Sequence, residues 1–232
     1  MEDIYMNNQY SKVILEYERV LLGQKKVFSS YYFNDLSEEM QERTALAVIK
    51  YAIETYLGWT PVQAKKCLNM HILRVLKLDT LLRYIHFWAE LDAKKDLFFI
   101  VYLMYPKQIR IDRRKYILNV YKDVVEHRRQ RFPKGFFDGI EGKNKASICF
   151  QYMLENYLNF TSKKQMYAFF ASPKASSVLQ QYRLSNVCSE IFITPIRFLH
   201  ESLPKSLRDE YDYKYAQYYA TPNSNLIVKK VV

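Results

Sequence analysis

The chain has 232 residues, of which 49% are hydrophobic and 25% charged, a composition that excludes a disordered or collagen-like polypeptide. Only 5 glycines and 7 prolines are present, too few turn formers for a many-stranded sandwich or barrel, so we expect an all-α protein. The formal net charge of +11 makes polyanions the partners to consider first.

A first helical module is predicted over residues 11–110, behind a short N-terminal arm at residues 1–10. Its first helix has the apolar spacing of an amphipathic helix at residues 13–21. A basic connector follows at residues 24–28, and a longer helix is predicted over residues 37–57. Thr60 and Pro61 have the residue types of an N-cap and a first helical position. The apolar run at residues 97–105 predicts a buried helix, because about 20 residues are needed to span a bilayer.

A second module with the same plan is predicted over residues 111–219, with a tail at residues 220–232. An arginine-rich connector follows its first helix, and a long helix is predicted over residues 144–158. Thr161 is predicted to cap the next helix, and Ser172 the one after, which runs from Pro173 to Arg183. Tyrosines crowd the last predicted helix, either to pack on the core or, as the alternative, to stack on single-stranded bases.

Landmark residues recur in the same order in both modules, which predicts an internal duplication. Tyr17 aligns with Tyr121, and Lys77 aligns with Arg183. The gaps in this alignment fall at expected loops, so chance matching of two helical segments rich in Tyr and Leu is the weaker explanation. Further aligned pairs are Val20 with Val124, Phe28 with Phe132, Tyr56 with Tyr157, Thr60 with Thr161, and Pro106 with Pro204.

Positive charge is concentrated in the second module. Residues 1–106 carry no net charge, whereas residues 107–232 carry the whole excess of +11. Arginine makes bidentate contacts to phosphate, and polyanion binding gains free energy from counterion release. These features predict that the second module binds nucleic acid. The neutral first module is then expected to be a scaffold that serves for dimerisation or for binding another protein.

The two short helices at residues 162–183 have the size of a helix-turn-helix unit, and the alternative is an ordinary αα-hairpin with a solvated polar face. Ser, Gln, Lys and Arg on the second helix are residue types that reach base edges and phosphates in a major groove. The candidate nucleic-acid-binding residues are Arg113, Arg114, Arg128, Arg129, Arg131, Lys134, Lys174, Ser177, Gln180, Gln181 and Arg183.

The preferred hypothesis is a non-enzymatic, cytoplasmic protein that binds double-stranded DNA, as a transcriptional or other DNA-linked regulator. The alternative from another class is a helical adaptor whose basic surface binds an acidic protein. RNA binding through shape is a third hypothesis. An anionic membrane is disfavoured, because the arginine cluster is too short for a basic amphipathic helix and ends at a proline.

No recognisable catalytic or cofactor motif is present in the sequence. The histidines lack metal-ligand spacing, and neither a phosphate-binding glycine loop nor a nucleophile elbow occurs. We therefore expect no enzyme activity, no cofactor and no metal site. The three cysteines, Cys67, Cys149 and Cys188, are widely spaced and odd in number, which is typical of reduced thiols in a cytosolic protein.

The repeated landmarks include residues 131–136, which read Arg-Phe-Pro-Lys-Gly-Phe, a Trp59-Thr60 helix start and the dipeptide Tyr105-Pro106. With these motifs the chain resembles a bacterial domain family of unknown function over both modules. It departs from the family pattern at residues 28–31, where Pro and Gly are missing, and at Leu203-Pro204. The resemblance implies a domain organisation and no particular activity.

Overall fold

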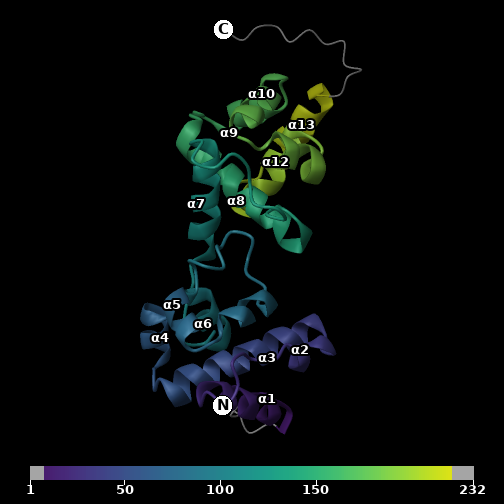
Figure 1. Cartoon of the computed structure of the whole chain (residues 1–232). Helices are drawn as coiled ribbons and strands as arrows, with labels where there is room; N and C mark the ends of the chain where they lie inside the picture. The colour runs from purple at the N-terminus through teal and green to yellow at the C-terminus, as the bar shows by residue number, and fades with distance from the viewer. Residues whose placement is uncertain (1–7, 221–232) are drawn as a thin grey trace. The chain divides into compact units, whose positions relative to one another are not determined.

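The computed structural model describes residues 8–220, which contain helices and no β-strand, so the predicted all-α class is confirmed (Figure 1). The chain divides into two compact units at Asp112 and Arg113. Residues 8–10 of the predicted N-terminal arm belong to the first helix. Residues 1–7 and 221–232, which include most of the predicted arm and tail, lie outside the described residues.

The first unit is built around one long helix. That helix, α3 (Glu38–Tyr51), continues into a π-helical turn (Ala52–Tyr56). Ser37 caps its start, where Glu38 and Glu39 interact favourably with the helix dipole. The other helices of this unit are α1 (Asn8–Leu21), α2 (Tyr31–Asn34), α4 (Pro61–Cys67), α5 (Met70–Val75), a 3-10 helix (Asp79–Tyr84) and α6 (Phe98–Met104).

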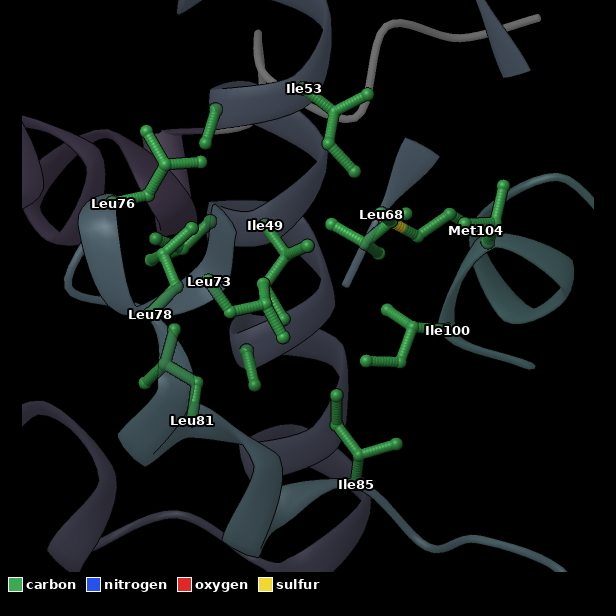
Figure 2. Packing of buried hydrophobic residues seen from close by; sticks show 14 of the residues in the cluster. Ile49, Ile53, Leu68, Leu73, Leu76, Leu78, Leu81, Ile85, Ile100 and Met104 are labelled. Atoms are coloured by element: carbon green, nitrogen blue, oxygen red, sulfur yellow. The ribbon is translucent and has the colours of Figure 1, made fainter. Parts of the chain in front are cut away.

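The core of the first unit surrounds α3. Figure 2 shows Ile49 of this helix and Ile53 of the π-helical turn after it among leucines from α5 and the segment that follows α5, with Ile100 from α6 on the other side. The exposed fraction of each of these isoleucines is 0%, so burial of each contributes about 2 kcal/mol. The predicted helix at residues 97–105 is present as α6 and is buried as expected.

The second unit also has a long central helix, α8 (Gly139–Tyr157). Phe150 from α8 packs on Phe198 with ring centroids 4.2 Å apart, and Phe198 stacks on Phe192 at the same distance. The other helices of this unit are α7 (Arg113–Val125), α9 (Lys163–Phe170), α10 (Lys174–Gln181), α11 (Ser185–Val187), a π-helical turn (Cys188–Phe192), α12 (Pro195–Ser202), a 3-10 helix (Lys205–Leu207) and α13 (Glu210–Ala220).

Helix α8 begins five residues earlier than the predicted start at residue 144. The two glycines at its start are typical of a loop, yet Gly142 is helical and the backbone of Phe137 runs directly over it. A Cβ atom at Gly142 would lie 1.7 Å from the Phe137 carbonyl oxygen. The glycine is therefore required by close backbone approach, which sequence pattern alone does not reveal.

The predicted helix caps are confirmed in the first unit and shifted in the second. Thr60 caps α4 in a full capping box with Gln63. In the second unit Ser162, rather than Thr161, caps α9. The predicted cap Ser172 instead donates its hydroxyl to the carbonyl of Phe169, and α10 begins after Pro173. Each of these starts lies within one residue of the predicted position.

Matching local geometry occurs in the two units. Lys77 lies two residues after the end of α5 and Arg183 two residues after the end of α10, and both have a left-handed backbone (φ 60° and 62°). Each end has the paired backbone hydrogen bonds of a Schellman motif. The Tyr17 hydroxyl donates to the carbonyl before Lys77 (3.1 Å), and the Tyr121 hydroxyl donates to the carbonyl before Arg183 (3.3 Å). These matched positions include the aligned pairs Tyr17/Tyr121 and Lys77/Arg183, and the duplication itself stays a prediction.

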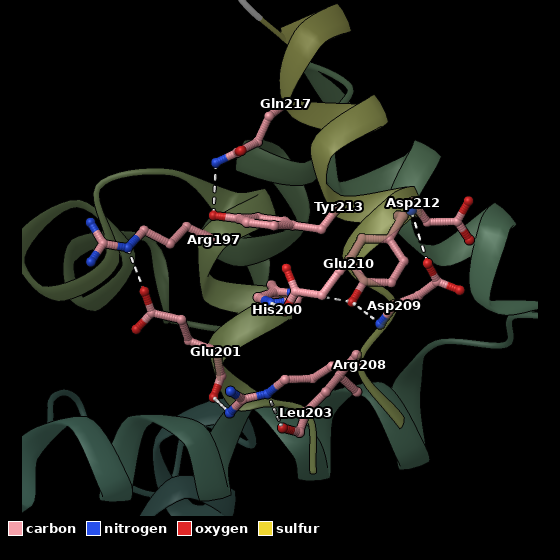
Figure 3. Close-up of polar contacts among 11 residues, drawn as sticks. Arg197, His200, Glu201, Leu203, Arg208, Asp209, Glu210, Asp212, Tyr213 and Gln217 are labelled. Atoms are coloured by element: carbon pink, nitrogen blue, oxygen red, sulfur yellow. Dashed lines mark hydrogen bonds and ion pairs between the residues drawn. The ribbon is translucent and has the colours of Figure 1, made fainter. Parts of the chain in front are cut away.

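Helix α13 is attached to α12 and α9 through His200 (Figure 3). The His200 ring stacks on Tyr213 with centroids 4.0 Å apart. Its Nδ1 lies 3.0 Å from the Tyr167 hydroxyl and its Nε2 lies 3.1 Å from the Glu210 carboxylate. Arg208 donates to the carbonyls of Leu203 and Glu201, which satisfies the C-terminal end of α12.

The tyrosines of α13 divide between the core side and the solvent. Tyr213 packs on His200, as the core-packing hypothesis predicts. Tyr211, Tyr215 and Tyr218 are instead 78%, 51% and 64% exposed, so that hypothesis is wrong for these three. Within residues 8–220, every helix is too short or too polar to cross a lipid bilayer.

Candidate nucleic-acid interface

The arginine-rich connector begins at the end of α7. His127 follows this helix with a left-handed backbone (φ 60°), a conformation that glycine adopts most easily. The N–H of Arg129 donates to the carbonyl of Asp123 at 2.8 Å, which turns the chain back on α7. Phe132 then stacks on Tyr121 with ring centroids 6.4 Å apart. The connector is thus attached at both ends, and its charged residues face solvent.

The cations of the connector differ in whether a carboxylate already neutralises them. Arg128 donates to Asp123 at 2.7 Å and also pairs with Glu126, and the bond to Asp123 raises the pKa of Arg128. Arg129, Arg131 and Lys134 are exposed, and within residues 8–220 they form no ion pair. The connector therefore offers three uncompensated cations, and Arg128 contributes less than the sequence predicts.

Helices α9 and α10 pack against each other as a short pair (Figure 1). Each has one buried and one exposed side. Tyr167 and Phe170 of α9 and Ala175 and Leu179 of α10 are buried in the unit. The predicted contact residues of α10 all lie on its exposed side and follow helical spacing. They are Lys174, Ser177, Gln180 and Gln181.

Carboxylates are absent from a long stretch around these two helices. Residues 156–189 contain no Asp or Glu, but include Lys163, Lys164, Lys174 and Arg183, all exposed. Lys163 and Lys164 are not among the candidate residues predicted from the sequence. The absence of acids over this stretch was the available signal, because a phosphate-facing surface excludes like-charged carboxylates.

The connector meets the end of α10 at one contact. An Arg183 guanidinium nitrogen lies 3.3 Å from Nδ1 of His127, and both residues have left-handed backbones. The Tyr121 hydroxyl donates to the Tyr182 carbonyl, and the Tyr182 ring stacks on Tyr157 at 4.8 Å. The start of the connector and the end of α10 are therefore neighbours. The sequence placed His127 near the arginine cluster but gave no sign of this contact.

Arg113 and Arg114 are not brought to this surface. They lie at the first turn of α7, about 18 Å along the helix axis from the connector. Arg113 lies 3.2 Å from the Glu141 carboxylate, and Arg114 lies 3.4 Å from the Gln151 side chain. Nearness in sequence to the other arginines suggested one cluster, whereas a helix of 13 residues separates them.

The cysteines do not form a reactive or metal-binding group. Cys67 is exposed, whereas Cys149 and Cys188 are buried, and all three are free thiols. Burial raises the pKa of both buried thiols, that of Cys188 to about 11. Among the described residues there is no group of His, Cys, Asp and Glu side chains suited to holding a metal ion.

The helices that carry this surface, α7 to α12, occur in one continuous stretch. Residues 117–206 match a family model described as "Protein of unknown function (DUF4046)". The resemblance to a domain family of unknown function is thus confirmed, and the match falls in the second unit. The DUF4046 region includes the connector and α10, and excludes Arg113, Arg114 and α13. No curated protein and no solved structure gives a significant match to the chain.

Proposed function

We propose that this chain is a non-enzymatic DNA-binding protein whose second unit contacts the duplex. The observation that carries the proposal is the joined surface of α10 and the connector. Helix α10 has an exposed polar side without carboxylates and is followed by Arg183, which touches His127 at the start of the connector that carries the three uncompensated cations. Such a surface combines a helix that fits a major groove with cations placed for phosphates. A regulatory role and a cytoplasmic location belong to the same proposal.

Two groups of residues have different roles in this binding mode. Arg129, Arg131 and Lys134 contact phosphates, which sets the position of the protein on the duplex without reading sequence. On α10, Gln180 and Gln181 approach base edges, where a glutamine amide can pair with adenine through two hydrogen bonds. Lys174, Ser177 and Arg183 extend this contact along the helix.

The decisive experiment is charge reversal in the connector, read out by fluorescence anisotropy with a labelled duplex. Arg129→Glu is expected to weaken binding to every duplex at about 50 mM salt and to lower the salt slope by about 1. Lys205→Glu makes the same change in net charge on the 3-10 helix of the same unit and should bind like the wild type. Equal effects of the two variants would contradict the proposed surface.

Sequence reading by α10 gives a separate readout. Gln180→Ala is expected to relax base preference at one position, costing about 1–3 kcal/mol of discrimination, with little change in the salt slope. A selection from random duplexes with both proteins would show it. Unchanged preferences would leave phosphate contacts alone as the function of this surface.

A protein-binding adaptor is the second candidate, and one observation favours it. Tyr211, Tyr215 and Tyr218 lie at i, i+4 and i+7 on α13, so these exposed tyrosines share one side of the helix. Tyrosine is enriched in protein interfaces because it combines apolar area with a polar tip. Saturable binding of an acidic peptide, without any binding of duplex DNA at about 50 mM salt, would favour the adaptor.

A further inference from the structure

The first unit, whose residues 1–112 carry a net charge of only +1, also has a surface of positive charge. Residues 55–78 contain no Asp or Glu, and the same is true of residues 156–189 in the second unit. The cations of this stretch are Lys65 and Lys66 on α4, Arg74 on α5 and Lys77 at its end. All four are exposed, and in the part of the chain that the structure describes none of them forms an ion pair.

The low net charge of the first unit results from carboxylates on other elements. Glu16 on α1 pairs with Lys25, and Glu39 on α3 pairs with Arg43. Glu54, which precedes the acid-free stretch, accepts a hydrogen bond from Tyr105 at 2.7 Å and lies 3.8 Å from Lys50. Since charges beyond a Debye length of about 10 Å are largely screened, the local surface of α4 and α5 decides what binds there.

The local backbone geometry after α5 matches that after α10 in the second unit. Lys77 and Arg183 occupy the same position of a Schellman motif. In both motifs the N–H of the next residue donates to a carbonyl five residues earlier, with a nitrogen–oxygen distance of 2.7 Å. Counting back from these residues, Arg74 corresponds to Gln180 and His71 to Ser177. All four are exposed, so α5 and α10 present their polar sides in the same way.

From this correspondence we propose that α4 and α5 form a second phosphate-binding surface, so that both units contact the same duplex DNA. The proposal rests on the proposed function of the second unit. Lys65, Lys66, Arg74 and Lys77 bind phosphates without reading sequence, because α5 has only six residues and carries two long cations at its end. A duplex fits better than an acidic protein, since its evenly spaced charges can engage both units, and the first contact then raises the effective concentration for the second.

The test uses the full chain and a duplex of about 40 base pairs, long enough for several contacts of the size seen in DNA-binding modules. Arg74→Gln with Lys77→Gln removes two cations without adding a carboxylate. The salt slope is expected to fall by about 2, and affinity at about 50 mM salt by about tenfold or more. Lys94→Gln with Lys95→Gln is the matched control, since these lysines are exposed in the same unit outside the acid-free stretch.

The failure of this inference is distinguishable from failure of the proposed function. If Arg129→Glu weakens binding while the Arg74/Lys77 variant behaves like its control, the second unit alone binds and the inference is overturned. If the wild-type chain binds no duplex, both proposals fall. If the Arg74/Lys77 variant loses binding to an acidic peptide but binds duplex as the wild type does, the inference is also overturned, in favour of a protein partner.

A measurement on the wild-type protein avoids any effect of the substitutions on folding. Lysine acylation followed by mass spectrometry reports the accessibility of each lysine with and without saturating duplex. Lys65, Lys66 and Lys77 are expected to react at least fivefold more slowly with duplex present, while Lys94 is unchanged. If duplex leaves the acylation rates of Lys65, Lys66 and Lys77 as unchanged as that of Lys94, the inference is overturned.

Discussion

Four non-glycine residues among those described have left-handed backbones, and two of them touch. Lys77, His127, Arg183 and Ile193 have φ between 60° and 70°. This conformation costs a non-glycine residue about 1–2 kcal/mol, so something in the fold must hold it. In the first unit Gly23 (φ 73°) lies six residues after Tyr17, just as His127 follows Tyr121. The second unit therefore carries His127 at the position where the first unit has Gly23, which adopts this backbone conformation with less strain.

Exchange of these residues makes a residue-scale prediction. His127→Gly should raise the free energy of unfolding by about 0.5 kcal/mol, because relief of backbone strain exceeds the entropy cost of glycine. Gly23→His, the reciprocal change, should lower it by about 1 kcal/mol. Urea unfolding of both variants measures the difference. A loss of stability in His127→Gly would show that the contact with Arg183 outweighs the strain.

At the scale of elements, helices α10 and α12 are held in the second unit by different interactions. Helix α10 is held from behind by apolar contacts and by the Tyr121 hydroxyl. On α12, Glu201 pairs with Lys143 and accepts from Arg197 at 2.5 Å. Burial opposes ionisation of Glu201, but the hydrogen bonds from Lys143 and Arg197 outweigh it, so the pKa of Glu201 is lowered.

The lowered pKa of Glu201 predicts a pH-dependent stability. A carboxyl group with a depressed folded pKa stabilises the fold above the ordinary value of about 4.3, and this contribution is lost as pH falls through the folded pKa. Glu201→Gln should therefore cost about 1 kcal/mol at pH 7 and progressively less below about pH 4. Thermal unfolding from pH 7 to pH 3 measures this difference. Glu155→Gln, at an exposed site in the same unit, is the control.

A stability difference between wild type and Glu201→Gln that persists unchanged to pH 3 would contradict the assignment. It would show that the substitution acts through packing and not through charge.

At the scale of the whole molecule, each unit has its own apolar core. The first unit buries a cluster that extends from Val13 to Ile109. The second buries an aromatic group that includes Phe150, Phe170 and Phe198. Because hydrophobic burial dominates folding free energy, separate cores give each unit the means to fold alone.

Separate expression tests this independence. Residues 1–112 and 113–232 are each expected to give a cooperative thermal transition, followed by circular dichroism at helical wavelengths. The full chain serves as the reference. A fragment with helical signal but no cooperative transition would show that its core needs the other unit.

Much of the fold was predictable because helix formation depends on local pattern. The start of α4 at Thr60 and the buried helix ending before Pro106 follow from cap chemistry and proline geometry. The early start of α8 was not predictable, since glycine disfavours a helix and the residues alone do not show that Phe137 approaches Gly142 too closely for a side chain. Local residue preferences carry no information about how closely the preceding loop approaches the helix.

The residue types of the candidate site were predictable from the sequence, but which residues lie together on one surface was not. The sequence by itself determined the helical class, the basic character of the second unit and the polar residue types of α10. Only the tertiary structure decided that Arg128 is neutralised by Asp123, that Arg113 lies at the far end of α7, and that His127 meets Arg183. The physical reason is that charge and helical period are properties of short segments, whereas ion pairs and shared surfaces depend on side chains brought together by packing.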